Sequence, residues 1–151
     1  MKLILACTPS GGIGYRNKLP WSKIQGDLPR FQRLTKNGTV VMGRNTWNDK
    51  AMPKPLPNRT NIVISSQDIP DVITIKNFPK DVSDEINEIW IIGGAKLIET
   101  SWDYIDEIYL TRTFAEYTCD TFIDIVKLER EFMCWFKENH TDHSYEIWKR
   151  K

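Results

Sequence analysis

The chain has 151 residues, with 21 Lys and Arg against 20 Asp and Glu, and a formal net charge of +1. This length predicts a single domain (residues 1–151) with a core and one pocket, and the balanced charge excludes an overall field for nucleic acid or a membrane surface. Three cysteines without a CxxC pair favour a reduced, cytoplasmic protein. The apolar run at the start covers only five residues, too short for an export signal, which needs about 7–15.

Strands and helices alternate along most of the chain. In chain order we predict a strand (2–8), a glycine-rich loop (9–17), a helix (27–36), a strand (39–42), a short helix after Gly43, a proline-rich loop (52–59), two strands (61–65 and 72–75), a weak helix (81–87), a strand (88–92), a helix (95–103), a strand (107–113), a solvated segment (129–131) and two strands (132–139 and 144–149).

This alternation predicts an α/β fold with a mostly parallel sheet covered on both faces. The last two strands are joined by a polar turn and add an antiparallel edge. Ligands of such sheets bind at the carboxyl ends of the strands. Chemistry-bearing residues at those ends are therefore the first candidates for a site.

Asp27 is the one carboxylate that the pattern places in a pocket. It shares a helical stripe with Phe31 and Leu34, where it would pair with a cationic or amidine-like ring edge. The alternative is a helix-capping aspartate, which is common at such a position. Trp21 also has two interpretations: it forms the wall of a pocket, or it packs in the core without a further role.

Two glycine-containing turns follow predicted strands. The turn over residues 43–46 combines free N–H groups with Arg44, and residues 91–95 repeat the arrangement. Together they favour a dinucleotide over a single phosphate, although an ordinary strand–helix turn explains each one alone. The glycines at residues 11–14 do not form a GxGxxG motif.

Two further features are weaker. Arg59 ends the proline-rich loop and is either a solvated arginine or a clamp for a carboxylate. His140 and His143 have no acid or cysteine beside them that completes a metal set. We therefore expect no metal site.

Five motifs stand in one order along the chain: Gly12-Ile13-Gly14 with Leu19-Pro20-Trp21, Asp27, Phe31 and Thr35; residues 40–47; residues 55–59 through Ser65-Ser66; Ile92-Gly93-Gly94-Ala95; and Tyr109-Leu110-Thr111 with Asp120-Thr121. In residue type and spacing this set resembles the signature of the dihydrofolate reductase family. The resemblance covers essentially the whole chain.

The resemblance implies an eight-stranded, mostly parallel sheet with about four helices, and the reduction of 7,8-dihydrofolate by NADPH in a monomer. It implies catalytic roles for Asp27, Trp21 and Thr111. The substrate-binding residues it implies are Ile4, Ala6, Asp27, Leu28, Phe31, Leu56, Arg59, Ile92 and Thr111. The cofactor-binding residues it implies are Ala6, Ile13, Gly14, Asn17, Lys18, Leu19, Gly43, Arg44, Asn45, Thr46, Ser65, Ser66, Gly93, Gly94, Ala95, Lys96, Leu97 and Thr121.

The chain departs from the family pattern at three positions. Ile98 stands where many members have a tyrosine, Cys119 replaces a small residue, and Asp124 stands where proline is frequent. Two other functions stay open. One is the related pyrimidine reductase of riboflavin synthesis, and the other is a module that binds NADPH or folate without catalysis.

Overall fold

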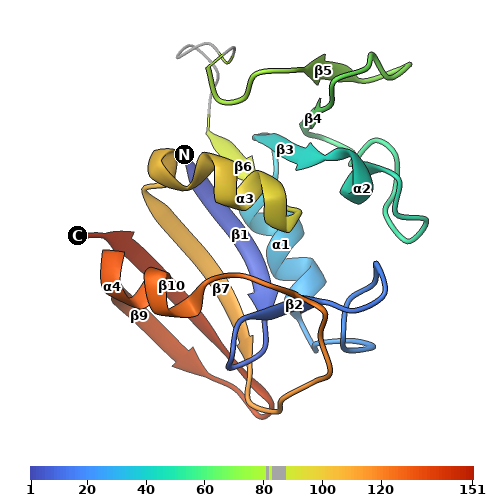
Figure 1. Ribbon diagram of the computed structural model, residues 1–151. Coiled ribbons are helices and arrows are strands. Elements are labelled where there is room, and N and C mark those ends of the chain that lie inside the picture. The colour runs from blue at the N-terminus through green and yellow to red at the C-terminus, as the bar shows by residue number, and fades with distance from the viewer. Residues whose placement is uncertain (81, 83–87) are drawn as a thin grey trace.

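The computed structural model describes residues 1–80, 82 and 88–151 (Figure 1). Its strands are β1 (Lys2–Cys7), β2 (Gly12–Gly14), β3 (Thr39–Gly43), β4 (Thr60–Ile64), β5 (Ile73–Ile75), β6 (Ile89–Ile91), β7 (Glu107–Thr113), β8 (Thr121–Phe122), β9 (Phe132–Asn139) and β10 (His143–Arg150). Its helices are α1 (Asp27–Thr35), α2 (Arg44–Trp47), α3 (Ala95–Ser101), the 3₁₀ turn η1 (Trp102–Tyr104) and α4 (Ile125–Glu131).

Eight strands form one sheet in the order β5-β4-β3-β6-β1-β7-β10-β9. All of its strand pairs are parallel except those that β10 makes with β7 and β9. The α/β class, the parallel sheet and the antiparallel C-terminal edge are thus confirmed. Because β1 and β6 occupy the centre, the carboxyl ends of β1, β3 and β6 meet at one edge of the sheet.

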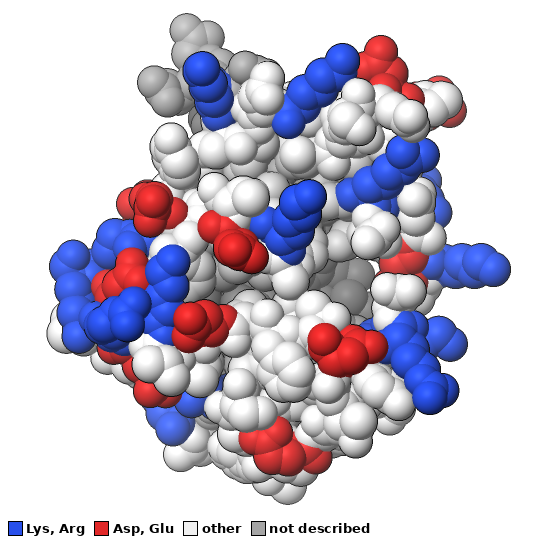
Figure 2. Space-filling model, in the orientation of Figure 1, with Lys and Arg blue, Asp and Glu red and all other residues white. Residues whose placement is uncertain are grey.

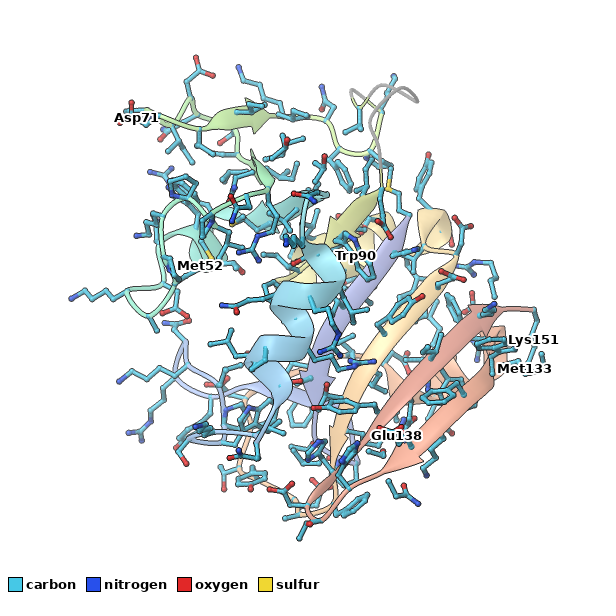
Figure 3. All side chains as sticks on the ribbon, turned by 180° about the vertical axis from the view of Figure 1, so that it is seen from behind. Met52, Asp71, Trp90, Met133, Glu138 and Lys151 are labelled. Carbon is cyan, nitrogen blue, oxygen red and sulfur yellow. The ribbon has the colours of Figure 1, made fainter. Side chains whose placement is uncertain are left out.

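Helices cover both faces of this sheet. Figure 1 shows α3 and α4 in front of it, and Figure 3, from behind, shows α1 across the opposite face. The α1 face holds an apolar cluster that includes Val40, Met42 and Trp90. The other face packs Leu97 of α3 and Leu128 of α4 against the sheet. The alternating buried positions of the strands therefore serve two cores.

One prediction about local structure was wrong. The predicted loop over residues 9–17 contains strand β2, which pairs with β8; both strands are too short to show an alternating pattern. The predicted solvated segment over residues 129–131 is confirmed for Glu129 and Arg130, which are exposed. The segment is also the end of helix α4, which the sequence did not predict. At the start of α4 the Asp124 carboxylate accepts a hydrogen bond from the backbone N–H of Lys127 at 3.0 Å. Full burial of Leu128 anchors this helix. The predicted helix over residues 81–87 lies outside the described residues.

Charged side chains of both signs are interspersed over the face in Figure 2, as the net charge predicts. Across the described part of the chain, none of the helices has both the length and the apolar composition that crossing a membrane requires.

Candidate active site

Asp27 is the first residue of α1, and its carboxylate does not cap the helix. Gly26 occupies the capping position with a left-handed φ of 82° and no side-chain hydrogen bond. The Asp27 Oδ1 atom instead accepts a hydrogen bond of 2.7 Å from the Thr111 hydroxyl on β7. The fold thus joins two residues 84 positions apart. The capping interpretation of Asp27 is therefore wrong, and the carboxylate is directed toward the sheet.

The Asp27 carboxylate faces a cavity of about 720 Å³ between α1 and the carboxyl end of β1. Trp21 is 7% exposed and packs edge-on against Tyr117, with ring centroids 6.0 Å apart. It forms part of the cavity wall, so pocket and packing are compatible roles for this residue. The residues from the substrate and catalytic predictions that line the cavity are Ile4, Ala6, Trp21, Asp27, Leu28, Phe31, Ile92 and Thr111.

A second hollow, of about 750 Å³, lies along the carboxyl ends of β3, β4 and β6. The residues from the cofactor prediction that line it are Gly43, Arg44, Asn45, Ser65, Ser66, Gly94, Ala95, Lys96 and Leu97. Ile92 lines the first cavity and Gly94 the second. The turn after β6 therefore separates two neighbouring sites, one with a carboxylate and one with cations.

Glycines let two backbone segments approach each other at the wall of the second hollow, and they add no side chains that would fill it. The Gly43 N–H donates to the Gly93 carbonyl at 2.9 Å, and the Gly93–Gly94 peptide is cis. A Cβ built on Gly93 or Gly94 would lie 3.7 or 3.9 Å from the Thr46 hydroxyl, which places Thr46 beside this turn. Backbone amides, hydroxyls and cations are the groups that hold phosphates, so this lining fits a dinucleotide.

A family model described as dihydrofolate reductase matches residues 1–149. The chain belongs to the dihydrofolate reductase family. Dihydrofolate reductase type 8 of Escherichia coli is 33% identical over 161 residues, covering 98% of this chain and 94% of that protein. The dihydrofolate reductase of Buchnera aphidicola is 34% identical over 163 residues, covering 99% of each.

A longer relative and a solved structure extend the comparison. The bifunctional dihydrofolate reductase-thymidylate synthase of Paramecium tetraurelia is 37% identical over 131 residues, and this chain spans only 28% of its length. The dihydrofolate reductase of Enterococcus faecalis, solved in complex with NADP(H) and RAB-propyl, superposes with a TM-score of 0.83 at 27% identity. That superposition covers 99% of this chain and 95% of the other.

Two of the substrate-binding residues that the dihydrofolate reductase resemblance implies lie outside the cavity wall. Leu56 is 7% exposed and packs in the apolar cluster that also holds Ile4 and Phe31. Arg59 donates to the Thr35 hydroxyl at 3.1 Å and to the Pro57 carbonyl at 2.9 Å. Its burial lowers the pKa of the guanidinium from the usual value.

Arg59 lines an adjoining groove of about 480 Å³ that meets the cavity at Pro29 of α1. The same groove is lined by Arg33 and Lys36. A ligand that extends from the cavity over the first turn of α1 therefore reaches a cationic surface. This placement suits a clamp for a carboxylate, as the family resemblance implies.

The remaining predicted cofactor residues come from the segment between β1 and α1, apart from Thr121 on β8. Asn17 and Lys18 line a recess with Asn45, and Leu19 is 63% exposed at the wall of the cavity that holds Asp27. Ile13, Gly14 and Thr121 lie in or beside the β2–β8 pair, where a Cβ on Gly14 would be 3.4 Å from the Thr121 Cβ.

The Asp120 carboxylate, which precedes β8, connects the β2–β8 pair to this loop. The Asp120 carboxylate accepts the Arg16 N–H at 2.9 Å and the Thr121 hydroxyl at 2.9 Å. These hydrogen bonds lower the pKa of the Asp120 carboxyl. The loop over the site is therefore tied to the segment that precedes α4.

Some residues at the sites were missed by sequence reasoning. Lys76 and Lys80 line the second hollow beside Arg44 and Lys96. Lys76 directly follows β5, so the rule on carboxyl ends of parallel strands gave a signal for it. Arg30 lines the cavity that holds Asp27, although its position carries no motif.

Each of the two histidines, His140 and His143, is paired with a neighbouring carboxylate. His140 pairs with Glu138 and His143 with Asp142, each at 2.6 Å, and their rings stack with centroids 4.9 Å apart. Among the described residues, no group of three or more His, Cys, Asp and Glu side chains is arranged to hold a metal ion.

Proposed function

We propose that this chain reduces 7,8-dihydrofolate to 5,6,7,8-tetrahydrofolate with NADPH, as a cytoplasmic monomer. The observation that carries the proposal is the Asp27 carboxylate, hydrogen-bonded to Thr111 at 2.7 Å inside a cavity of about 720 Å³. Family membership and the neighbouring cation-lined hollow support it. Together they provide a carboxylate for an amidine-like ring edge and a cradle for a dinucleotide.

The Asp27 carboxylate binds the 2-amino group and the adjacent ring nitrogen of the pterin. A carboxylate presents two oxygens to two parallel donors, which fixes the ring in one orientation. The Thr111 hydroxyl donates to Oδ1 and holds the carboxylate in place for this pairing. The negative charge of Asp27 raises the basicity of the bound ring, so that N5 takes a proton from water. Trp21 in the cavity wall holds that water with its indole N–H.

The second hollow is the site that we assign to NADPH, which when bound would supply the hydride for pterin C6. Arg44, Thr46 and Ser66 bind its phosphates, and Lys96 adds positive charge. The glycine turn at residues 93–94 admits the cofactor close to the backbone beside Ile92, at the boundary with the substrate cavity. The chain thus contributes mainly position and electrostatics, because the cofactor carries the hydride chemistry.

A pyrimidine reductase of riboflavin synthesis is the second candidate, since it shares the fold and cofactor. The groove with Arg59 beside the Asp27 cavity favours a substrate with a carboxylate tail instead. A two-substrate assay with NADPH separates them. Oxidation of NADPH with dihydrofolate and none with the ribosylamino-pyrimidine supports our proposal, and the reverse contradicts it. NADPH binding without turnover of either substrate would favour a non-catalytic module.

Arg59→Ala is expected to raise the KM for dihydrofolate about 10- to 50-fold and leave the KM for NADPH unchanged. The reason is the loss of a charge-assisted pair with the glutamate tail. Steady-state kinetics with each substrate varied in turn measures both constants. A dihydropterin without the glutamate tail is the control, because its KM should not respond to the variant. An unchanged KM for dihydrofolate contradicts the clamp.

Gly43→Val is expected to raise the KM for NADPH about 30-fold, because the branched side chain occupies space in the cofactor hollow. A Cβ here would lie 3.6 Å from the Gly94 nitrogen, an ordinary contact, so we expect the fold to tolerate the change. Gly43→Ala should give an intermediate effect. The dissociation constant of NADPH and the melting temperature are measured together. A large loss of Tm with unchanged NADPH affinity would show that Gly43 serves folding instead.

A further inference from the structure

Arg30 places a buried positive charge in the wall of the substrate cavity. It is 8% exposed, stands three residues after Asp27 on α1 and lines the same cavity. Its guanidinium carbon lies 4.2 Å from the ring centroid of Tyr145 on β10. Tyr145 is paired in the sheet with Thr111, the residue that hydrogen-bonds Asp27. Arg30, Tyr145, Thr111 and Asp27 therefore form one connected group.

One carboxylate and two cations line this cavity, Asp27 against Arg30 and Lys23. Asp27 is the only carboxylate in the lining that the described residues provide, and the exposed Lys23 is the other cation. Burial lowers the pKa of Arg30, whereas Tyr145 and Asp27 act in the opposite direction. An arginine at such a site stays protonated. Stacking on an aromatic ring compensates part of the cost of burying its charge.

We propose that Arg30, held in place by Tyr145, offsets part of the Asp27 charge and so reduces the advantage that this cavity gives to a ring with a positive charge over a neutral ring with the same donor edge. This role rests on the proposed function, since it concerns ligands that pair with Asp27. A neutral ring binds Asp27 by donating hydrogen bonds to its two oxygens, so a nearby positive charge affects it little. A ring cation gains attraction from Asp27 but is also repelled by Arg30, so the net advantage of its charge is reduced.

The predicted effect follows from the charges near Arg30. Besides Asp27, the charged and titratable groups that act on it are Arg33 on α1, Tyr109 on β7 and Tyr145 on β10. Coulomb repulsion between two unit charges across a partly solvated cavity changes the affinity on the order of tenfold. Arg30 is then a specificity-determining residue whose removal affects cationic ligands selectively.

The test compares trimethoprim, a diaminopyrimidine that protonates on its ring, with dihydrofolate in Arg30→Met and Arg30→Lys. Arg30→Met should lower the inhibition constant of trimethoprim about tenfold and change the KM for dihydrofolate less than about threefold. Arg30→Lys keeps the charge and should keep the wild-type ratio of the two constants. Arg130→Met removes an exposed charge (68%) on α4 and serves as the control.

Two variants of Tyr145 test whether this ring holds the guanidinium. Tyr145→Phe keeps the aromatic face and should leave the ratio unchanged, whereas Tyr145→Leu should shift it toward that of Arg30→Met. Equal changes for both ligands in Arg30→Met, or an Arg30→Lys variant that behaves like Arg30→Met, would overturn the inference. Wild-type protein that does not turn over dihydrofolate would contradict the proposed function itself, a separate result.

Discussion

Asp27→Asn is expected to lower kcat/KM for dihydrofolate about 10²- to 10³-fold at neutral pH. An amide presents one acceptor and one donor where the ring edge offers two donors, and it lacks the charge that raises the basicity of the bound ring. The Thr111 hydroxyl, now 2.7 Å from Oδ1, still finds an acceptor in the asparagine. Steady-state oxidation of NADPH measures the loss.

The same substitution is expected to change folding little. Asp27 is in the first turn of α1, where a carboxylate contributes about 0.3–1 kcal/mol to helix stability, so the Tm should fall by no more than about 4 °C. Asp103→Asn, at an exposed position on η1, is the matched control and should affect neither quantity. Losses of rate and stability that are comparable in free energy would count against a catalytic role for Asp27.

Glu146→Gln is expected to lower the free energy of unfolding by about 2–3 kcal/mol. Glu146 is 1% exposed on β10 and lies 3.7 Å from the Arg112 Nε atom on β7. It also accepts hydrogen bonds from Ser144 at 2.8 Å and from the Trp148 indole at 2.9 Å. The amide cannot accept from both and leaves the guanidinium without its buried counter-charge. Denaturant titration measures the loss.

Glu129→Gln is the control for this prediction, because Glu129 contacts the same arginine from the surface. Its carboxylate is 3.8 Å from Arg112 Nη1 and 53% exposed. We expect a loss below about 0.5 kcal/mol. If both substitutions cost the same, the stability would come from the ion pairs of Arg112 in general and not from the buried network that joins β7 to β10.

Local patterns predicted the parts of the fold that local physics determines. The apolar runs of β1 and β3 and the helical spacing of Leu28, Phe31 and Leu34 indicated buried strands and α1. Helix α4 was missed because three consecutive charges at residues 129–131 follow its one fully buried residue, Leu128, and leave no helical apolar pattern. The β2–β8 pair was missed because it consists of two short segments brought together by tertiary structure.

The site residues also fall into two groups: those that motifs indicated and those that only the folded structure reveals. Family motifs indicated Asp27 and Thr111, and the structure places them in hydrogen-bond contact. Lys76 lines the same hollow as Arg44 because β5 joins the sheet next to β4, and sequence alone does not give that order. Arg30 belongs to no motif. Its contact with Tyr145 depends on the position of β10 in the folded sheet, which the sequence does not give.

The most direct test is to incubate the wild-type protein with NADPH and dihydrofolate and measure NADPH oxidation and tetrahydrofolate together, with and without methotrexate. The proposed function predicts one tetrahydrofolate for each NADPH oxidised, and complete inhibition by methotrexate. NADPH that binds while dihydrofolate remains unreduced would contradict it, and the cavity around Asp27 would then need another ligand.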